Sequence, residues 1–294
     1  MKILIPTDFS ENSKPGTYLA IQIAALNDAE LVFIHVFNAA KFQQNEVSYA
    51  EEKEKEIMLK RLMLEKFIAD AFDNMKITPR RSSCEVIEGF KADIAIVDYC
   101  RHHHEIDYIC ISTRGAGLLN KLLGTNTGNL IAQSPVPVIA VPSNYKIQPL
   151  HTILYAADLH NYEAELNKVI EFASPIQLKV EILHFLLAHE QDEKSQLTAE
   201  IHKNIPDHTI KTHFKINDLE VPLIKQLKEQ LQQLKPSIAV LFTKQDRTFF
   251  EKLFLSSMAE ELSFKSSVPV LVFNKNFQFD KKGIEAEKIQ NMGE

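Results

Sequence analysis

A glycine-rich segment contains the residues of this chain best suited to binding chemistry. Four of the eight glycines lie within STRGAGLLNKLLGTNTG at 112–128, and none follows until Gly283. Glycine is favoured where the backbone needs a positive φ or where another group approaches it closely. A helix that begins in such a segment presents unpaired N–H groups and a positive dipole end, which favour an anion. The segment therefore predicts a phosphate site, with Arg114 as a nearby cation and Thr125 and Thr127 as hydroxyl donors.

A second candidate residue is Asp8, which follows the first apolar strand of the chain. Its carboxylate can accept a hydrogen bond from a ribose hydroxyl or an adenine amino group. Ligands of open α/β sheets bind beyond the carboxyl ends of the strands, so Asp8 and Val36 would lie near a base and Gly115 and Gly124 near phosphates. The alternative is that the glycines only form a tight turn and a helix cap. Neither Walker nor Rossmann spacing is present.

The elements that must position these residues follow from apolar periodicity. Strands are predicted at 3–5, 31–37, 84–87, 108–111 and 136–141, and helices at 13–27, 50–74, 93–102 and 126–133. Fully apolar strands separated by helices indicate a parallel sheet covered on both faces. The glycine-rich segment then comes directly after the fourth strand.

The same order of elements recurs in the second half of the chain, which indicates an internal repeat. ILIPTDF at 3–9 returns as ILYAADL at 153–159, LVFIHVF at 31–37 as VEILHFL at 180–186, and SPVPVIAV at 134–141 as SSVPVLVF at 266–273. The repeat pairs Asp8 with Asp158 and His35 with His184. It predicts two domains, at 1–145 and 150–275, and a C-terminal tail at 276–294.

Composition favours a cytoplasmic protein that binds neither nucleic acid nor membrane. The net charge is −6, whereas sequence-independent binding to nucleic acid needs a basic face. There is no run of 18 apolar residues for a membrane span. The three cysteines show no C-x-x-C spacing and are expected to be reduced thiols. Three successive histidines at 102–104 cannot all reach one ion from a helix, so no metal site is predicted. No Ser-His-Asp order and no nucleophile elbow is evident, so no catalytic residue is predicted.

The two copies together resemble a tandem universal stress protein. KILIPTDFSENS is similar to the opening strand and turn of that family, and SPVPVIAVP to its closing strand. The resemblance implies an α/β fold of two flavodoxin-like or adenine-nucleotide α-hydrolase-like domains. Each would be a five-stranded parallel sheet with helices on both faces. The two closing strands would meet, so that the chain forms an intramolecular pseudo-dimer.

The resemblance also implies a ligand, which is ATP or another adenine nucleotide, with or without magnesium. The ATP-binding members carry G-x2-G-x9-G-[S/T], whereas here Ser112 replaces the first glycine and the second spacer has eight residues. The adenosine end would meet Pro6, Thr7, Asp8 and the backbone of Val36. The phosphates would meet Ser112, Arg114, Gly115, Gly124, Thr125, Asn126 and Thr127.

The second copy departs from this pattern in the segment TKQDRTFFEKLFLSS at 243–257. Gln245 and Ser256 stand where the first copy has Gly115 and Gly124, and Asp246 adds a negative charge. Side chains at those positions would obstruct close approach to phosphate, so one nucleotide pocket is predicted, in the first copy.

The predicted function is an adenine-nucleotide-binding stress regulator with at most slow ATP hydrolysis. It would act on an unknown protein partner, and a further homodimer is an option. One alternative is a stress scaffold that binds no nucleotide and acts through protein contacts. Another is an adenylating or hydrolysing enzyme on the same fold.

Overall fold

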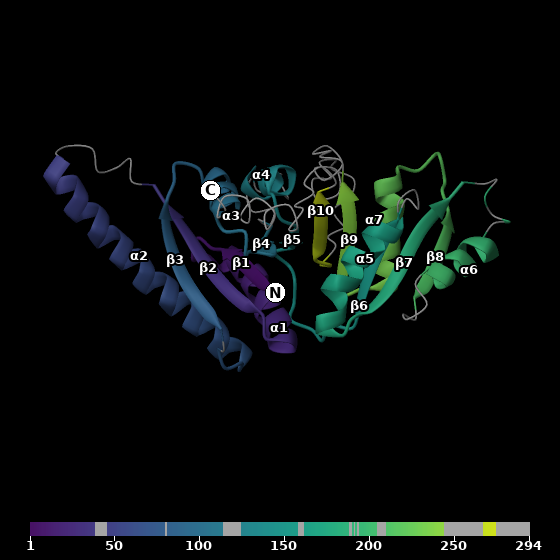
Figure 1. Cartoon of the computed structure of the whole chain (residues 1–294), viewed down its shortest axis with the longest axis horizontal. Helices are drawn as coiled ribbons and strands as arrows, with labels where there is room; N and C mark the ends of the chain where they lie inside the picture. Colours follow the sequence, from purple (N-terminus) through teal and green to yellow (C-terminus); the bar gives the residue numbers. More distant parts are fainter. Residues whose placement is uncertain are drawn as a thin grey trace, which may run out of the picture.

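A computed structural model describes residues 1–38, 46–79, 81–113, 125–157, 162–187, 190, 192, 194–204, 210–243 and 267–274 (Figure 1). The first half contains β1 (Lys2–Pro6), η1 (Glu11–Ser13), α1 (Lys14–Asn27), β2 (Glu30–Phe37), α2 (Glu46–Met75), β3 (Ser82–Glu88), α3 (Ala92–His102), β4 (Tyr108–Ser112), α4 (Thr125–Gln133) and β5 (Val138–Val141). The second half contains β6 (Thr152–Ala157), α5 (Tyr162–Ala173), η3 (Ser174–Ile176), β7 (Lys179–Leu186), α6 (Lys194–Asn204), β8 (Lys211–Ile216), α7 (Leu223–Leu234), β9 (Ile238–Thr243) and β10 (Val270–Asn274).

The strands form one ten-stranded sheet in the order β3-β2-β1-β4-β5-β10-β9-β6-β7-β8. Neighbouring strands are parallel within each half. At the centre, β5 and β10 are antiparallel, with Val270 opposite Ala140. The order is therefore palindromic, as a pseudo-twofold relation between the halves requires. This confirms the predicted fold class, with the addition that the two five-stranded sheets join edge to edge.

Each face of the sheet is covered by helices because the strands are apolar on both sides. Ile3 and Ile5 of β1 belong to a core shared with α1, α2 and α5. Leu4, the residue between them, belongs to the opposite core, shared with α3, α4 and α7. Alternate residues of a strand point to opposite faces, so this one short strand contributes to both cores. The sheet is doubly wound, as the alternation of strands and helices predicted.

Both cores continue across the junction between the halves. The ring of Tyr108 on β4 lies 5.1 Å from that of Phe172 on α5 in an edge-to-face arrangement. The segment linking the halves is also held to the first half: the Tyr145 hydroxyl donates to Oε1 of Gln22 at 2.6 Å, and Nε2 of Gln22 donates to the Gln148 carbonyl at 2.9 Å. The halves therefore pack as one body and are not joined only by a linker.

Two further predictions concern a membrane span and the C-terminal tail. Within the described part of the chain, no helix combines the length and the apolar content needed to cross a membrane. The predicted tail at 276–294 lies outside the described residues.

Replacing Leu271 by alanine is expected to destabilise the whole chain. Leu271 is fully buried in β10 opposite Ile139, and truncating a buried leucine costs about 2–5 kcal/mol. Because both cores span the junction, chemical denaturation followed by circular dichroism should still show one transition, at lower denaturant. Leu219→Ala is the matched control, since Leu219 is 83% exposed and its loss should cost less than about 0.5 kcal/mol. Two separate transitions in Leu271→Ala would contradict the shared core.

Candidate functional site

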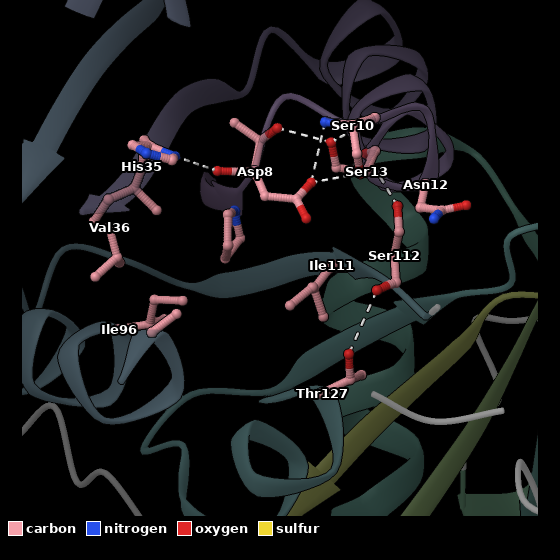
Figure 2. A pocket seen from close by; sticks show the side chains of 14 residues that line it. Asp8, Ser10, Asn12, Ser13, His35, Val36, Ile96, Ile111, Ser112 and Thr127 are labelled. Atoms are coloured by element: carbon pink, nitrogen blue, oxygen red, sulfur yellow. Dashed lines mark hydrogen bonds between the residues drawn. The ribbon is translucent and has the colours of Figure 1, made fainter. Parts of the chain in front are cut away.

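A cavity of about 190 Å³ opens where the carboxyl ends of β1 and β4 lie side by side. The chain leaves β1 into α1 on one face of the sheet and leaves β4 toward α4 on the other. This is the topological switch point at which doubly wound sheets bind ligands. The cavity is lined by Pro6, Thr7, Asp8, Ser10, Asn12, Ser13, Ile34, His35, Val36, Ala92, Ile96, Ile111, Ser112 and Thr127 (Figure 2).

The cavity brings together predicted site residues from four separate elements. Those that line it are Pro6, Thr7, Asp8, Val36, Ser112 and Thr127. Thr125 and Asn126 lie in the first turn of α4, which begins one residue earlier than predicted. Arg114, Gly115 and Gly124 lie outside the described residues. The described residues therefore include the predicted base end of the site and, from the predicted phosphate end, Ser112 and the start of α4.

Sequence analysis missed the apolar wall that α3 contributes. Figure 2 shows Ile96 beside Val36, with Ile111 on the other side of the same space. Ile96 belongs to the stripe of α3 that packs on the sheet together with Val97 and Cys100. A helix was predicted at 93–102, but the sequence did not indicate which strand ends this helix would reach.

Backbone turns at the end of β1 orient the Asp8 carboxylate. Its Oδ1 accepts hydrogen bonds from the Ser10 backbone N–H at 3.1 Å and from the Ser10 hydroxyl at 2.6 Å. Asp8 is exposed to solvent at the edge of the cavity. An ionised carboxylate only accepts hydrogen bonds, so this residue can select hydroxyl or amino groups on a ligand.

The hydroxyl of Thr7 is committed to holding the same turn. The Ser13 hydroxyl donates its hydrogen to the Ser10 carbonyl at 2.8 Å. At the 2.8 Å contact between Thr7 Oγ1 and Ser13 Oγ, Thr7 must therefore be the donor. Thr7 Oγ1 also accepts from the Phe9 N–H at 3.0 Å. Thr7 therefore lines the cavity with a side chain whose hydroxyl hydrogen is already used within the protein.

Ser112 joins the end of β4 to the start of α1. Its hydroxyl accepts from the Gly16 N–H at 2.7 Å and donates to the Ser13 carbonyl at 3.0 Å. A side chain at Gly16 would place its Cβ 2.8 Å from the Ser112 backbone nitrogen, so only glycine permits this approach. The Thr127 hydroxyl likewise donates to the Ser112 carbonyl, at 3.4 Å. The hydroxyl hydrogens of Ser112 and Thr127, two residues predicted to meet phosphate, are thus engaged within the protein.

His35 supports the cavity as a neutral residue. Its Nδ1–H donates to the Thr7 carbonyl at 2.9 Å, since a carbonyl can only accept. Its ring stacks on Phe9 with centroids 4.1 Å apart. Burial lowers the pKa of His35 below its ordinary value of 6.5, which keeps the ring uncharged at neutral pH. His35 is thus a half-buried, hydrogen-bonded residue in the wall of the cavity.

The second half has a histidine that corresponds to His35 but no serine that corresponds to Ser112. His184 bonds the Ala157 carbonyl at 2.9 Å, as His35 bonds Thr7. Strand register places Phe242 where Ser112 stands, because Ser112 lies opposite Val141 and Phe242 opposite Phe273.

Phe242 is held there by aromatic neighbours. Its ring stacks on Phe273 at 4.7 Å and meets Tyr155 edge-on at 5.5 Å. Asp158, the predicted counterpart of Asp8, and the predicted departures at Gln245, Asp246 and Ser256 lie outside the described residues.

The described residues show no arrangement of three or more His, Cys, Asp or Glu side chains that could hold a metal ion. The polar side chains that line the cavity are the Asp8 carboxylate, the Asn12 amide, the neutral His35 ring and several hydroxyls that are bonded within the fold. This set suits the recognition of an uncharged polar ligand surface beside an apolar wall.

Comparison with known proteins gives a family match over the first 142 residues. Residues 1–142 match the universal stress protein family. Over the whole chain, the fold is similar to the crystal structure of a universal stress protein from Archaeoglobus fulgidus, with a TM-score of 0.63 and 17% identity, covering 93% of this chain and 98% of that one. A candidate universal stress protein from Pseudomonas aeruginosa has a TM-score of 0.56 and 11% identity, covering 93% and 92%. At these identities the likeness concerns the fold. No curated protein matches the chain.

Replacing Ser112 by alanine is expected to lower the free energy of unfolding by about 1–3 kcal/mol, the cost of leaving a buried hydrogen-bonding group unpaired. The Gly16 N–H would lose the Ser112 hydroxyl as its acceptor, and the Ser13 carbonyl would keep only the Thr17 hydroxyl of its two side-chain donors. Chemical denaturation measures the loss, and Ser83→Ala on the exposed part of β3 is the matched control. Equal stability of the two variants would show that Ser112 does not tie β4 to α1.

Replacing His35 by phenylalanine is expected to weaken the pH dependence of stability. The lowered pKa of His35 means that, as pH falls below about 6.5, the unfolded chain takes up a proton before the folded chain does. Stability due to the neutral ring is therefore complete above pH 6.5 and is lost as pH falls through the folded pKa. Thermal unfolding at pH 7.5 and 5.5 should show a smaller drop for His35→Phe than for the parent chain. An equal drop would contradict this assignment.

Proposed function

We propose that the first half of this chain binds an adenine nucleotide and acts as a regulator in the stress response. The observation that carries the proposal is the cavity at the β1–β4 switch point, where an apolar wall faces an oriented carboxylate. That combination complements a flat base attached to a sugar with free hydroxyls. The match of residues 1–142 to the universal stress protein family supports the same reading.

The volume of the cavity suits one part of a nucleotide. At about 190 Å³ it is smaller than pockets that enclose a whole drug-sized ligand, which begin near 300 Å³. We infer that the base lies against Val36, Ile96 and Ile111, and that Asp8 accepts from a ribose hydroxyl or from the adenine amino group. The remainder of the ligand then extends out of the cavity.

The start of α4 gives the phosphates a direction to extend in. Thr127, in the first turn of this nine-residue helix, lines the cavity. Unpaired N–H groups of a first turn attract anions. We propose that the main chain at 124–127 and the side chain of Arg114 bind the phosphates. Because the hydroxyls of Ser112 and Thr127 are engaged elsewhere, main-chain donors are expected to dominate.

A regulatory role is proposed because the cavity offers little for catalysis. His35 has its Nδ1–H bonded to the Thr7 carbonyl. Among the described serines that line the cavity, Ser13 and Ser112 donate their hydroxyls to main-chain carbonyls, and Ser10 donates its hydroxyl to Asp8. Hydrolysis would be slow at most. We place this function in the cytoplasm, where the three cysteines, which are unpaired in the structure, would stay reduced.

The second half is proposed to be a partner domain without a nucleotide. We divide the chain into domains at 1–145 and 150–275 and a tail at 276–294, in a tandem of universal stress protein domains. Phe242, packed between Phe273 and Tyr155, supports this because it occupies the position of Ser112. If neither half binds nucleotide, the alternative of a scaffold that acts through protein contacts takes its place.

Replacing Asp8 by alanine tests the proposed base and ribose contacts. Calorimetric titration of the parent chain with ATP, ADP, AMP and adenosine, with and without magnesium, should show binding at one site. A hydrogen bond to a charged group contributes about 1.5–3 kcal/mol, so Asp8→Ala should weaken adenosine and ATP alike, by roughly 10- to 150-fold. Asp73→Ala on the exposed side of α2 is the matched control.

Arg114→Ala separates the two ends of the site, since it should weaken ATP and leave adenosine unchanged. Absence of binding by the folded parent chain would favour the scaffold. Binding that survives Asp8→Ala but is lost in Asp158→Ala would place the ligand in the second half.

A further inference from the structure

Helix α2 carries an apolar patch on the side that faces away from the sheet. Its inner side packs on the sheet through Leu64, Phe67 and Ile68. On its outer side Met58 is 67% exposed, Leu59 51% and Leu62 55%. Figure 1 shows α2 running along the outer side of β3 at one end of the molecule. Three large apolar side chains in one patch, on a helix with no neighbour beyond it among the described residues, point to an interaction surface.

The residues along the exposed side of α2 follow the spacing of a helix-pairing seam. Positions 51, 55, 58, 62, 65 and 69 alternate steps of four and three residues, and all of these residues are exposed. Steps of four and three keep side chains on one line along a helix that packs on another. The middle of this line is apolar, with Met58 and Leu62, and it is bounded by Lys55 on one side and Glu65 on the other.

This line is self-complementary when reversed. Lys55 and Glu65 are equally far from residue 60, and so are Met58 and Leu62. If two copies of α2 lie antiparallel about that point, Met58 of one copy faces Leu62 of the second. Lys55 then faces Glu65 at both ends of the patch. Leu59, beside the twofold axis, lies next to Leu59 of the second copy.

We propose that the chain forms a homodimer through antiparallel pairing of α2 with α2 of a second copy. The pairing covers the apolar patch and sets opposite charges against each other at both of its ends. A parallel pair would instead place Lys55 against Lys55 and Glu65 against Glu65, which are unfavourable contacts. The surface complements itself in one orientation only, which favours a second copy over an unrelated protein as its partner.

The dimer is independent of the proposed nucleotide site. The patch lies on the outer side of α2, whereas the cavity opens at the ends of β1 and β4. Pairing through α2 also differs from the contact between β5 and β10, which is satisfied within one chain. An isologous contact of this kind closes on itself, so the assembly stops at two copies.

Charge reversal at the ends of the patch tests both the contact and its direction. Sedimentation velocity over a range of concentrations should show a monomer–dimer equilibrium for the parent chain. Lys55→Glu should raise the dimer dissociation constant at least tenfold, because two Lys–Glu contacts become Glu–Glu contacts. Glu65→Lys should do the same by creating two Lys–Lys contacts.

Two experiments that restore opposite charges across the contact make the test more specific. The double variant Lys55→Glu/Glu65→Lys should dimerise like the parent chain, and an equimolar mixture of the two single variants should form heterodimers. Lys168→Glu on an exposed position of α5 makes the same change in net charge and should leave dimerisation unchanged. Circular dichroism should show parental helicity in every variant, since the inner side of α2 is untouched. Leu62→Ser should also abolish the dimer.

Several outcomes would overturn the proposal. A parent chain that stays monomeric at the highest concentration at which it is soluble excludes this dimer. A dimer that Leu62→Ser leaves intact is held by another surface. A dimer that Leu62→Ser abolishes but that neither single charge reversal weakens is not the antiparallel pair proposed.

Discussion

The antiparallel pairing of β5 with β10 is the constraint on which the rest of the architecture depends. Each half alone would expose the edge of a fully apolar strand, with its backbone N–H and carbonyl groups unpaired. Pairing the two edges satisfies those groups and merges the cores on both faces of the sheet. Because the described strands are antiparallel at this contact and parallel within each half, the switch points of the two halves are related by a pseudo-twofold rotation. The two halves of one chain thus pair edges that each half alone would leave exposed.

The two halves agree at one strand end and differ at the next. The histidine contacts correspond, since His35 bonds the Thr7 carbonyl just after β1 and His184 bonds the Ala157 carbonyl at the end of β6. At the ends of β4 and β9 the halves differ in chemistry. Ser112 ties β4 to the start of α1 through two hydrogen bonds, whereas Phe242 fills the equivalent position by packing on Phe273 and Tyr155. In the first half, Ser112 is hydrogen-bonded and lines the cavity. In the second half, Phe242 stabilises the same position by packing against other aromatic rings.

Much of this fold could be predicted because its signals are local. Short apolar runs located the strands, and the repeat located the junction, since the closing strands are its best-preserved segment. The start of α2 was placed four residues late because its first turn at Glu46 carries no apolar periodicity. Val36 was predicted to lie near a base because strand ends converge by topology, whereas its neighbours Ile34 and His35 also line the cavity and were not predicted to do so. Ile96 could not be predicted from the sequence, because its position depends on how α3 crosses the sheet.

Ser112 shows why a motif position does not by itself define a role. Its place in the glycine-rich segment predicted a phosphate contact. The structure commits its hydroxyl to Ser13 and Gly16, which lie almost a hundred residues earlier in the chain. That contact depends on α1 lying against β4, and it requires glycine at position 16. A tertiary contact of this kind leaves no periodic signal in the sequence around either residue.

The turn after β1 connects the cavity to α2. Phe9 adopts a positive φ of 65°, which costs a bulky residue about 1–3 kcal/mol and persists only where the surroundings hold it. Here the Phe9 N–H donates to the Thr7 hydroxyl oxygen, and the Phe9 ring stacks on His35. The same ring meets Phe67, on the inner side of α2, in an edge-to-face arrangement with the ring centroids 6.3 Å apart. Asp8, the residue just before Phe9, is the carboxylate that faces the cavity. The turn that orients the candidate ligand contact is therefore held in its strained form by the helix whose outer side carries the apolar patch. Packing of α2 against the sheet and the position of Asp8 depend on the same few contacts.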